Sequence, residues 1–304
     1  MQLSDALTEY RYAILEHAPK TREWYEQKLV VFLAWCESDG VDLADLKPLH
    51  LRRFLAYLRE RPNERYPERG NLSDNTVKGY AQVMKGFLTF CAKEELISER
   101  LAKQAPIPHV ESKVIQTFTR EQVKRLFTAC GLESFRVLAE RDRAILAVLL
   151  DTGIRASELC GLRLENAFLQ PNDGYLLVDG KGRKQREVGL GKEARTHVHR
   201  YIYRYRDAPR SEHHIFVGRR RQPMTPYGLD QMLYRLRDWA GIVGIRCSAH
   251  TFRHTFAVSY LAAGGDIYKL SRLMGHSNVS TTEIYLRDYK DRDARKGPSV
   301  LDQW

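Results

Sequence analysis

The chain has 304 residues, 43% of them hydrophobic and 10% aromatic, which suffices for a sizeable buried core and argues against a wholly disordered protein. No apolar run approaches the roughly 18 residues that cross a bilayer, so no membrane span is predicted. The first residues lack the basic and apolar regions of a secretory signal. The five cysteines are odd in number and include no CxxC pair, which argues against a disulfide framework and a zinc-thiolate site. We therefore expect a cytoplasmic protein.

The net charge of +11 is unevenly distributed along the chain. Residues 1–110 carry 16 Lys and Arg against 16 Asp and Glu, whereas residues 111–304 carry 33 against 22. All of the excess positive charge therefore belongs to the last two thirds. A basic chain without a membrane signal indicates a polyanionic partner, most often nucleic acid, although ordinary solubility charge gives the same balance.

The first third of the sequence is predicted to be helical. Apolar residues recur at helical spacing after Thr21, a suitable N-cap, and again after Pro48, a residue suited to a first turn. A third amphipathic helix follows Ser73 or Asp74, either of which can cap it. These patterns predict a small helical bundle over residues 1–105.

Residues 106–116, which begin with two prolines between polar neighbours, are predicted to link this bundle to a second domain at 117–304. In the second domain, a glycine-rich turn joins short strands at Tyr175–Val178 and Arg186–Leu190, which predicts a β-hairpin. The expected fold class is mainly α with a small antiparallel sheet, in two domains. Further helices are predicted at 119–129, 135–151, 192–206, 226–240, 250–263, 267–274 and 281–289.

The residues that can carry chemistry are cationic or phenolic. The sequence holds no GxxxxGK[ST] phosphate loop, no HExxH and no GxSxG, and it shows no paired carboxylates suited to a two-metal site. It does hold an HxxR motif, an arginine after a glycine helix stop, a lysine at the hairpin tip and a Gly-His pair followed by a tyrosine. The candidates are Arg155, Lys181, His250, Arg253, His276 and Tyr285, with Glu158 one turn after Arg155.

Each candidate taken alone has an ordinary structural explanation. Arg155 can be a surface residue paired with Glu158, and His276 can cap a helix. The four-residue spacing of His250 and His254 suits a metal ion, but the sequence offers no third ligand nearby, so no metal is predicted. The order and spacing of the whole set carry more information than its members.

This set resembles the tyrosine recombinase (phage integrase) family. Arg253 of the HxxR motif is followed after 23 residues by His276 of the Gly-His pair, and after nine more by Tyr285. The stretch Leu261–Tyr285 is similar to the Xer-like branch. The resemblance covers the whole chain and implies a helical core-binding domain for DNA at 1–105 and a catalytic domain at 117–304.

The resemblance also implies roles for the cationic residues. Arg155 and Arg253 would bind the nonbridging oxygens of the scissile phosphate, in place of a metal ion. His250 and His276 would add hydrogen bonds and move protons. Glu158 would orient Arg155, or it would serve only as a charge that caps the helix.

Tyr285 is implied to be the nucleophile, which forms a 3′-phosphotyrosyl bond and releases a 5′-hydroxyl. Lys181 is implied to protonate that leaving oxygen, with Lys184 as the alternative at the same hairpin tip. Because the covalent bond conserves the energy of the broken one, religation would need no metal, no ATP and no other cofactor. The implied activity is DNA recombination or integration at a specific site, through a four-way junction.

The implied partners are double-stranded DNA and further recombinase protomers. Synapsis of two sites requires four protomers, either a homotetramer or a tetramer with a related recombinase, and the tail 298–304 would dock on a neighbour or on its own domain. The alternatives are a type IB topoisomerase, a telomere-resolving enzyme or a non-catalytic DNA-binding regulator on the same scaffold. Candidate DNA contacts are Arg183, Lys184, Arg186, Arg219, Arg220, Arg221, Lys78 and Lys85, of which Arg219–Arg221 can equally be a solvated turn.

Overall fold

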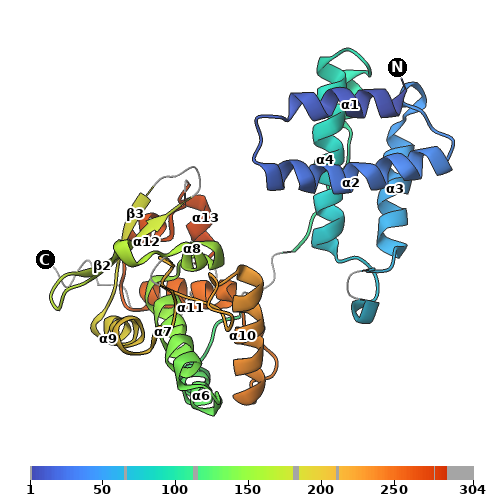
Figure 1. The fold of residues 1–304 in the computed structure, drawn as a ribbon. Coiled ribbons are helices and arrows are strands. Elements are labelled where there is room, and N and C mark those ends of the chain that lie inside the picture. Colours follow the sequence, from blue (N-terminus) through green and yellow to red (C-terminus); the bar gives the residue numbers. More distant parts are fainter. Residues whose placement is uncertain are drawn as a thin grey trace, which may run out of the picture. The chain divides into compact units, whose positions relative to one another are not determined.

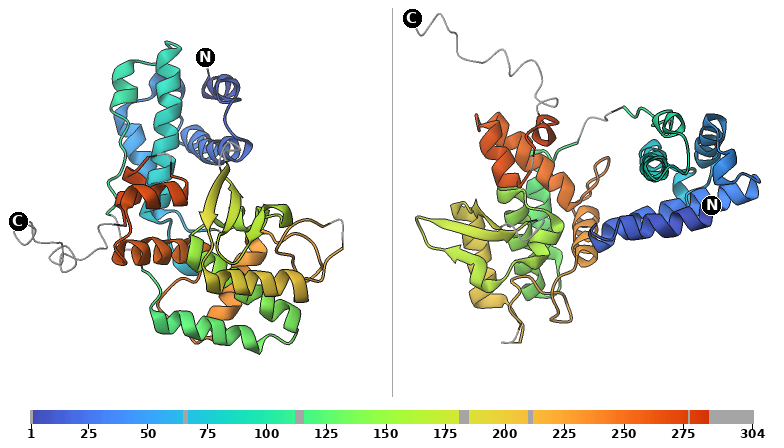
Figure 2. Two further views of the ribbon diagram at one scale, coloured as in Figure 1. Left: turned by 90° about the vertical axis from the view of Figure 1, so that its left-hand side faces the viewer. Right: turned by 90° about the horizontal axis from the view of Figure 1, so that it is seen from above.

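The chain divides into two compact units, Met1–Lys113 and Val114–Trp304, and the division falls within the predicted linker. Figures 1 and 2 show the computed structural model. None of the helices within the described ranges is long and apolar enough to cross a membrane. The structure describes residues 2–64, 67–111, 116–180, 185–209, 212–276 and 278–285.

The first unit is a helical bundle in which α1 and α2 run across α3 and α4 (Figure 1). The predicted cap Ser73 accepts a hydrogen bond from the backbone N–H of Thr76. The predicted cap Thr21 is wrong, because α2 begins at Pro19, whose fixed φ suits the first helical position. Aromatic rings fill the core, where the ring of Phe32 makes edge-to-face contact with that of Phe54. The helices are α1 (Leu3–Ala13), α2 (Pro19–Ser38), α3 (Pro48–Glu60), α4 (Asp74–Lys93) and α5 (Glu99–Lys103), with 3-10 turns at Leu43–Asp45 and Pro67–Arg69.

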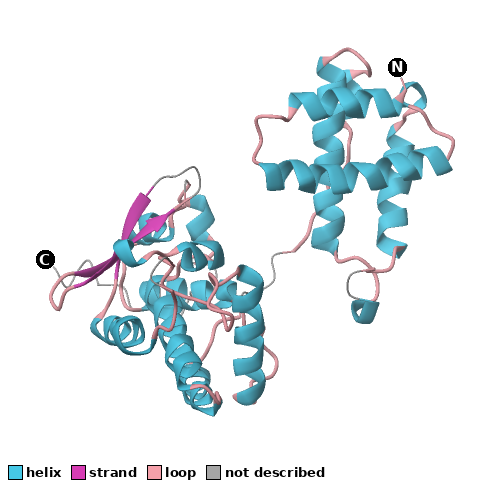
Figure 3. Cartoon of the chain, in the orientation of Figure 1, coloured by secondary structure: helices cyan, strands magenta, loops and turns pink. Residues whose placement is uncertain are grey.

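The second unit is mainly helical, with a three-stranded antiparallel sheet of order β1-β2-β3 (Figure 3). The predicted fold class is confirmed, and β2 and β3 form the predicted hairpin, in which Asp179 pairs with Gln185. Strand β1 was not predicted. The elements are α6 (Arg120–Ala129), α7 (Arg136–Thr152), α8 (Ala156–Gly161), β1 (Ala167–Leu169), β2 (Gly174–Asp179), β3 (Gln185–Gly189), α9 (Lys192–Arg200), α10 (Pro226–Trp239), α11 (Ala249–Ala262), α12 (Ile267–Met274) and α13 (Ser280–Glu283), with 3-10 turns at Cys130–Leu132 and Leu164–Asn166 and a π-helical turn at Tyr201–Tyr205.

Helices α7 and α11 pack against each other in the core of this unit and fix the start of the candidate site. Helix α7 ends at Gly153, which adopts a left-handed φ of +59°, and a Cβ there would lie 2.4 Å from the ring of Phe256 on α11. Only glycine fits both the backbone conformation and the close approach. The chain can therefore turn sharply and place Arg155 at the N-terminus of α8.

The short helix α13 differs from its prediction. It begins at Ser280, one residue before the predicted start, and the carboxamide of Asn278 accepts the hydrogen bond from the Ser280 N–H. The predicted helical residues after 285 lie outside the described ranges.

Candidate active site

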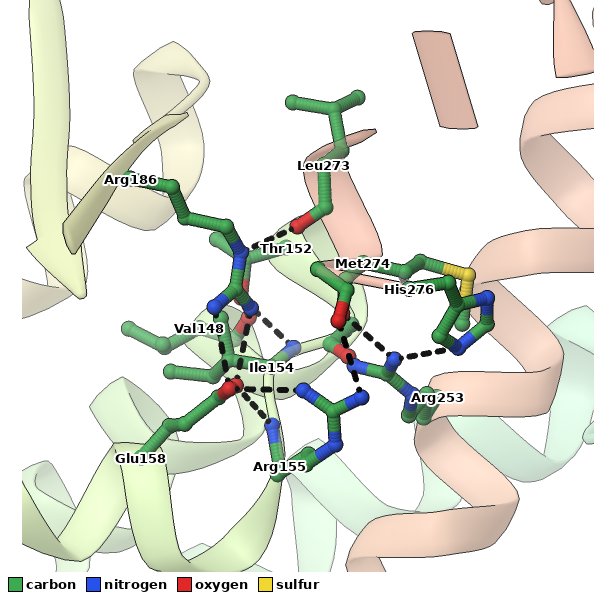
Figure 4. Close-up of polar contacts among 12 residues, drawn as sticks. Val148, Thr152, Ile154, Arg155, Glu158, Arg186, Arg253, Leu273, Met274 and His276 are labelled. Carbon is green, nitrogen blue, oxygen red and sulfur yellow. Dashed lines mark hydrogen bonds and ion pairs between the residues drawn. The ribbon is translucent and has the colours of Figure 1, made fainter. Parts of the chain in front are cut away.

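Three arginines from distant parts of the sequence meet at the C-terminus of α12 (Figure 4). Arg155 is the N-cap residue of α8, Arg186 lies on β3, and Arg253 lies on α11. Each guanidinium donates to one of three consecutive backbone carbonyls at the end of α12. The pairs are Arg186 Nε to Leu273 O at 2.8 Å, Arg253 Nη2 to Met274 O at 2.7 Å, and Arg155 Nη2 to Gly275 O at 3.3 Å.

The end of α12 attracts these cations for a general reason. The last carbonyls of a helix have no partner within it, and they form the negative end of the helix dipole. Gly275 ends α12 in the left-handed region, at φ +64°, and a Cβ there would lie 3.0 Å from the guanidinium carbon of Arg186. Glycine is thus required both for the helix stop and for the approach of the arginine.

Glu158 connects two of the arginines and is itself buried, with 4% of its side chain exposed. It accepts hydrogen bonds from the backbone N–H and Nη1 of Arg155, at 2.8 and 2.9 Å, and from Nη1 and Nη2 of Arg186, at 3.0 and 2.9 Å. Burial raises the pKa of this carboxyl, but the bonds from Arg186 and Arg155 outweigh it and lower the pKa overall. Glu158 therefore holds the guanidinium of Arg155 and caps the N-terminus of α8.

Arg186 departs from its predicted role as a DNA contact. Its side chain is 15% exposed, and its Nε, Nη1 and Nη2 all donate to protein oxygens. This inward position corrects the prediction of an open phosphate contact, because the carboxylate of Glu158 already occupies the fork of the guanidinium. The sequence alone gave no sign of this pairing, which joins residues 28 positions apart.

Arg253 is the most deeply buried cation of the site, with 4% of the residue exposed. Its Nη1 donates to the carbonyl of Gly153 at 2.7 Å, and its Nη2 lies 2.8 Å from Nε2 of His276. Burial and the neighbouring Arg155 lower the pKa of Arg253 to about 10, so it stays charged at neutral pH. Since a guanidinium can only donate, Nε2 of His276 accepts this bond.

The other ring nitrogen of His276 must then carry the proton. Its Nδ1 lies 2.8 Å from Oγ1 of the buried Thr282 and donates to it. Burial, together with the charges of Arg253 and Arg155, lowers the pKa of His276 to about 4. His276 is therefore a neutral imidazole whose orientation is fixed on both sides.

His250 and His254 lie one turn apart on α11, and their Nε2 atoms are 2.7 Å apart. His250 is exposed, whereas His254 is 4% exposed. Burial and the charge of Arg253 lower the pKa of His250. Across the described ranges, no three His, Cys, Asp or Glu side chains are grouped so that they could hold a metal ion.

Tyr285 lies beside these groups but is 2% exposed. Its ring centre is 5.2 Å from that of His254 and 6.4 Å from that of His276. Burial raises the pKa of its phenol, and the positive charge of Arg253 opposes that rise. In this conformation the ring is part of an apolar cluster and cannot touch a ligand. The other buried members of the cluster are Ala257, Leu261, Leu270 and Met274.

The remaining candidates lie away from this cluster or outside the described ranges. Lys181, Arg183 and Lys184, which follow β2 in the sequence, are outside them, as is the tail 286–304. Arg219, Arg220 and Arg221 are exposed in a turn, where Arg219 lies 5.1 Å from the ring centre of Phe135 and Arg221 pairs with Asp207 at 2.6 Å. Lys78 and Lys85 are half-buried, seven residues apart on α4.

Sequence reasoning missed two features near these candidates. Thr282 was not singled out, although it fixes the proton of His276. In the first unit, Lys28 lies 4.4 Å from the ring centre of Trp24 and 5.1 Å from that of Tyr80, which adds a cation beside the predicted Lys78 helix. The contacts of His276 with Thr282 and of Lys28 with Tyr80 join residues whose spacing follows no motif, so only the folded chain reveals them. Trp24 and Lys28 are instead four residues apart on α2, a spacing at which helical side chains meet.

Comparisons with known proteins identify the family of the chain. The family model described as the phage integrase family matches residues 116–292. A tyrosine recombinase XerC of Leptospira interrogans is 30% identical over 281 residues, which cover 91% of this chain and 85% of that protein. A tyrosine recombinase XerD of Pseudomonas aeruginosa is 32% identical over 273 residues, which cover 88% and 86%.

Solved structures share the fold at lower identity. A XerH site-specific recombinase bound to a palindromic difH substrate superposes with a TM-score of 0.75 at 19% identity and covers 97% of this chain and 84% of that one. A lambda integrase (75–356) dimer bound to a core site gives 0.69 at 18%, and covers 92% and 97%. The convergence of Arg155, Arg253, His276 and Tyr285, together with these relatives, shows that the chain belongs to the phage integrase family and is a tyrosine recombinase.

Proposed function

We propose that this protein cuts and rejoins duplex DNA at specific sites through a covalent bond to Tyr285. The observation that carries the proposal is the convergence of two guanidiniums and a neutral, oriented imidazole next to the buried tyrosine: Arg155, Arg253 and His276. The two guanidiniums are preorganised donors that suit a phosphodiester, whose charge grows on the nonbridging oxygens as a nucleophile attacks. Arg155 is the accessible member, since 40% of its side chain is exposed.

The proposed reaction is a transesterification in two directions. The phenolic oxygen of Tyr285 bonds to phosphorus, the bond from phosphorus to the 5′-oxygen breaks, and a 3′-phosphotyrosine forms. The phenolic proton passes to Nε2 of His276, the ring nitrogen that carries no proton, and Lys181 or Lys184 protonates the departing 5′-oxygen. A 5′-hydroxyl from the partner duplex then attacks the phosphotyrosine and releases Tyr285. Atoms and charges balance without a metal ion or ATP, so no cofactor is assigned.

The proposed substrate is double-stranded DNA that carries a recombination site. It is supported by the structural neighbours that hold DNA, such as the XerH complex and a Tn1549 transposon integrase with circular intermediate DNA, which has a TM-score of 0.74 at 17% identity. Residues 1–105 would bind the core of the site and residues 117–304 would perform the chemistry. The candidate DNA contacts outside the cluster are Lys78, Lys85, Arg183, Lys184, Arg219, Arg220 and Arg221.

The exchange of strands requires four protomers on two duplexes, either identical or shared with a related recombinase. The tail 298–304 would connect neighbouring protomers. Its deletion is then expected to reduce recombination more than the binding of one protomer to one site. An equal loss of both activities would contradict the docking of the tail on a neighbour.

A covalent trapping experiment tests the proposal. Duplexes that the protein binds are selected from a randomised pool, and a nick near the cleavage position lets the 5′-hydroxyl fragment diffuse away. Wild type is expected to give a protein–DNA adduct on a denaturing gel in the presence of EDTA, and Tyr285→Phe is expected to give none. The matched control is Tyr268→Phe, because Tyr268 is 66% exposed on α12 and lies outside the cluster.

Each result has a defined meaning. An adduct that persists in Tyr285→Phe would reject this nucleophile, and an adduct lost with EDTA would reject metal-free chemistry. Relaxation of supercoils without joint products from two duplexes would indicate a type IB topoisomerase activity. Tight binding without any adduct would indicate a DNA-binding regulator.

A further inference from the structure

His254 is a buried histidine that the proposed chemistry does not use. It lies one turn after His250 on α11, and the two rings are nearly perpendicular, with centres 4.0 Å apart and an interplanar angle of 78°. Their Nε2 atoms are 2.7 Å apart, which is a hydrogen bond with one proton between two nitrogens. One histidine must therefore donate and the other must accept.

The second nitrogen of His254 decides the direction of this bond. Its Nδ1 is buried and has no hydrogen-bond partner among the described residues. A proton on Nδ1 would be a buried N–H donor without an acceptor, which folded proteins avoid more strictly than an unpaired acceptor. The proton is therefore better placed on Nε2, from which His254 donates to His250.

The surroundings keep both rings neutral. The charged or titratable groups that face them are Arg253 on the same helix, Arg246 just before it and the phenol of Tyr285. Burial, then His250 and Arg253, lower the pKa of His254 to about 4. Burial, then Arg253 and Arg246, lower the pKa of His250. Among the residues that the structure describes, no carboxylate compensates either ring, so a proton added to the pair meets the positive charges of Arg253 and Arg246.

We propose that His254 is a positioning residue that holds His250 as its neutral Nδ1–H tautomer. His250 accepts through Nε2, so its only proton is on Nδ1, and no hydrogen bond within the described residues uses that nitrogen. Because His250 is exposed, this N–H is the one it offers to the scissile phosphate. Free histidine prefers the opposite, Nε2–H tautomer, so the assignment is a specific one.

The pair also resists protonation of His250. An imidazolium donates from both nitrogens, and two N–H groups cannot face each other across 2.7 Å. His254 would have to move its proton to the unpartnered Nδ1, which costs the desolvation of a buried donor. The contact with His254 therefore keeps His250 neutral, with its proton on Nδ1, at pH values below the ordinary histidine pKa of about 6.5. This role rests on the proposed function.

The direct test is nitrogen-15 NMR of the histidine rings in the free protein, which needs no DNA and no activity. Wild type is expected to show a protonated Nδ1 on His250 and a protonated Nε2 on His254 near neutral pH. In His254→Phe, His250 is expected to regain the Nε2–H form and a pKa closer to the ordinary value of about 6.5. A protonated Nε2 on His250 in wild type would overturn the proposal.

The functional test is the pH profile of single-turnover cleavage on the nicked duplex. His254→Phe is expected to bind DNA as wild type does but to cleave about tenfold more slowly at neutral pH, which is less than the 10² to 10⁴ that a whole acid–base group contributes. The acid limb of its profile is expected to move to higher pH. His254→Gln keeps an N–H donor in place and is expected to restore both rate and profile.

The control is His197→Phe, since His197 is another histidine with a buried, unpartnered Nδ1 but lies on α9 against Phe127. It is expected to leave the profile unchanged. Equal slowing by His254→Phe and His254→Gln without a shift of the acid limb would show a merely structural role and overturn the proposal. If wild type forms no adduct at all, the proposed function fails, while the NMR result still decides the tautomer.

Discussion

The ion-pair arrangement around Glu158 makes a strong prediction for stability. In Glu158→Ala, Nη1 and Nη2 of Arg186 both lose their carboxylate acceptor, and only 15% of this side chain is exposed to water. Arg155 also loses the carboxylate, but its side chain is 40% exposed, so water can replace that partner. Breaking a buried ion pair by removing one partner costs about 3–5 kcal/mol, and an exposed pair contributes only about 0–1 kcal/mol. For a unit of this size the loss corresponds to a fall in Tm of about 6–20 °C.

Calorimetry of the full chain, read on the transition of the second unit, measures this fall. The control is Glu165→Ala, because Glu165 pairs with Arg163 at 2.8 Å with 58% and 40% of the two side chains exposed. That variant is expected to lower Tm by no more than about 4 °C. The exposed pair contributes about 0–1 kcal/mol, and 1 kcal/mol changes Tm by about 2–4 °C in a unit of this size. Similar shifts for the two variants would refute the reasoning. A double replacement of Glu158 and Arg186 by leucine is expected to recover much of the loss, since neither charge is then left unpaired.

The same carboxylate gives wild type a pH dependence with a defined sign. The pKa of Glu158 is lowered in the folded chain, so the unfolded chain takes up the proton first on acidification. The stabilisation is complete above the ordinary carboxyl pKa of about 4.3 and is lost as the pH falls through the folded value. Glu158→Ala lacks this stabilisation at every pH. The difference in free energy of unfolding between wild type and Glu158→Ala should therefore become smaller as the pH is lowered.

Three further changes test other parts of the site. Gly153→Ala combines a positive φ with a Cβ placed 2.4 Å from the ring of Phe256. Thermal melting should show a loss in free energy of unfolding that exceeds the roughly 1–2 kcal/mol cost of a left-handed residue. A smaller loss would mean that Phe256 moves aside freely. Arg253→Lys keeps a positive charge, but one ammonium cannot reach the carbonyls of Gly153 and Met274 as well as His276. The rate of adduct formation on nicked DNA should fall about 10²–10³-fold, the effect of one lost transition-state donor, while DNA binding is retained. His254 and His276 both have pKa values of about 4 in the folded chain, below the ordinary value of about 6.5. The unfolded chain therefore takes up these protons first, so the midpoint of urea unfolding should fall as the pH is lowered from about 6.5 to about 4. A rise would contradict the burial of both rings in the neutral form.

Local signals accounted for the elements that were predicted well. The cap Ser73 and the helix stop Gly153 each act within one turn of the backbone, so the order of residues alone reveals them. The error at Thr21 has the same origin, because Pro19 offered a competing local start that the sequence reading did not use. Strand β1 escaped prediction because its three residues carry too short a pattern.

Long-range pairing explains what the sequence did not reveal about the site. The resemblance placed Arg155, Arg253 and His276 in one site, and the structure brings them together. Nothing in the local pattern says that Arg186 turns inward toward Glu158, because that choice depends on where β3 meets α8 in the folded unit. An arginine counted as a surface charge in the sequence is thus an internal one in the structure.

The charges around the end of α12 explain why the site is prepared for a phosphate. Arg155, Arg186 and Arg253 bring three positive charges, Glu158 removes one, and the helix terminus supplies about half a negative charge. Within the described part of the chain, about one and a half of these positive charges remain without a counter-charge. The backbone carbonyls at the end of α12 hold the three guanidiniums apart in fixed positions. An anionic phosphodiester is the natural counter-charge, and since the donors are already oriented, little reorganisation opposes its binding. A substitution that adds a carboxylate beside Arg155 would supply that charge in advance and is expected to weaken the binding of DNA.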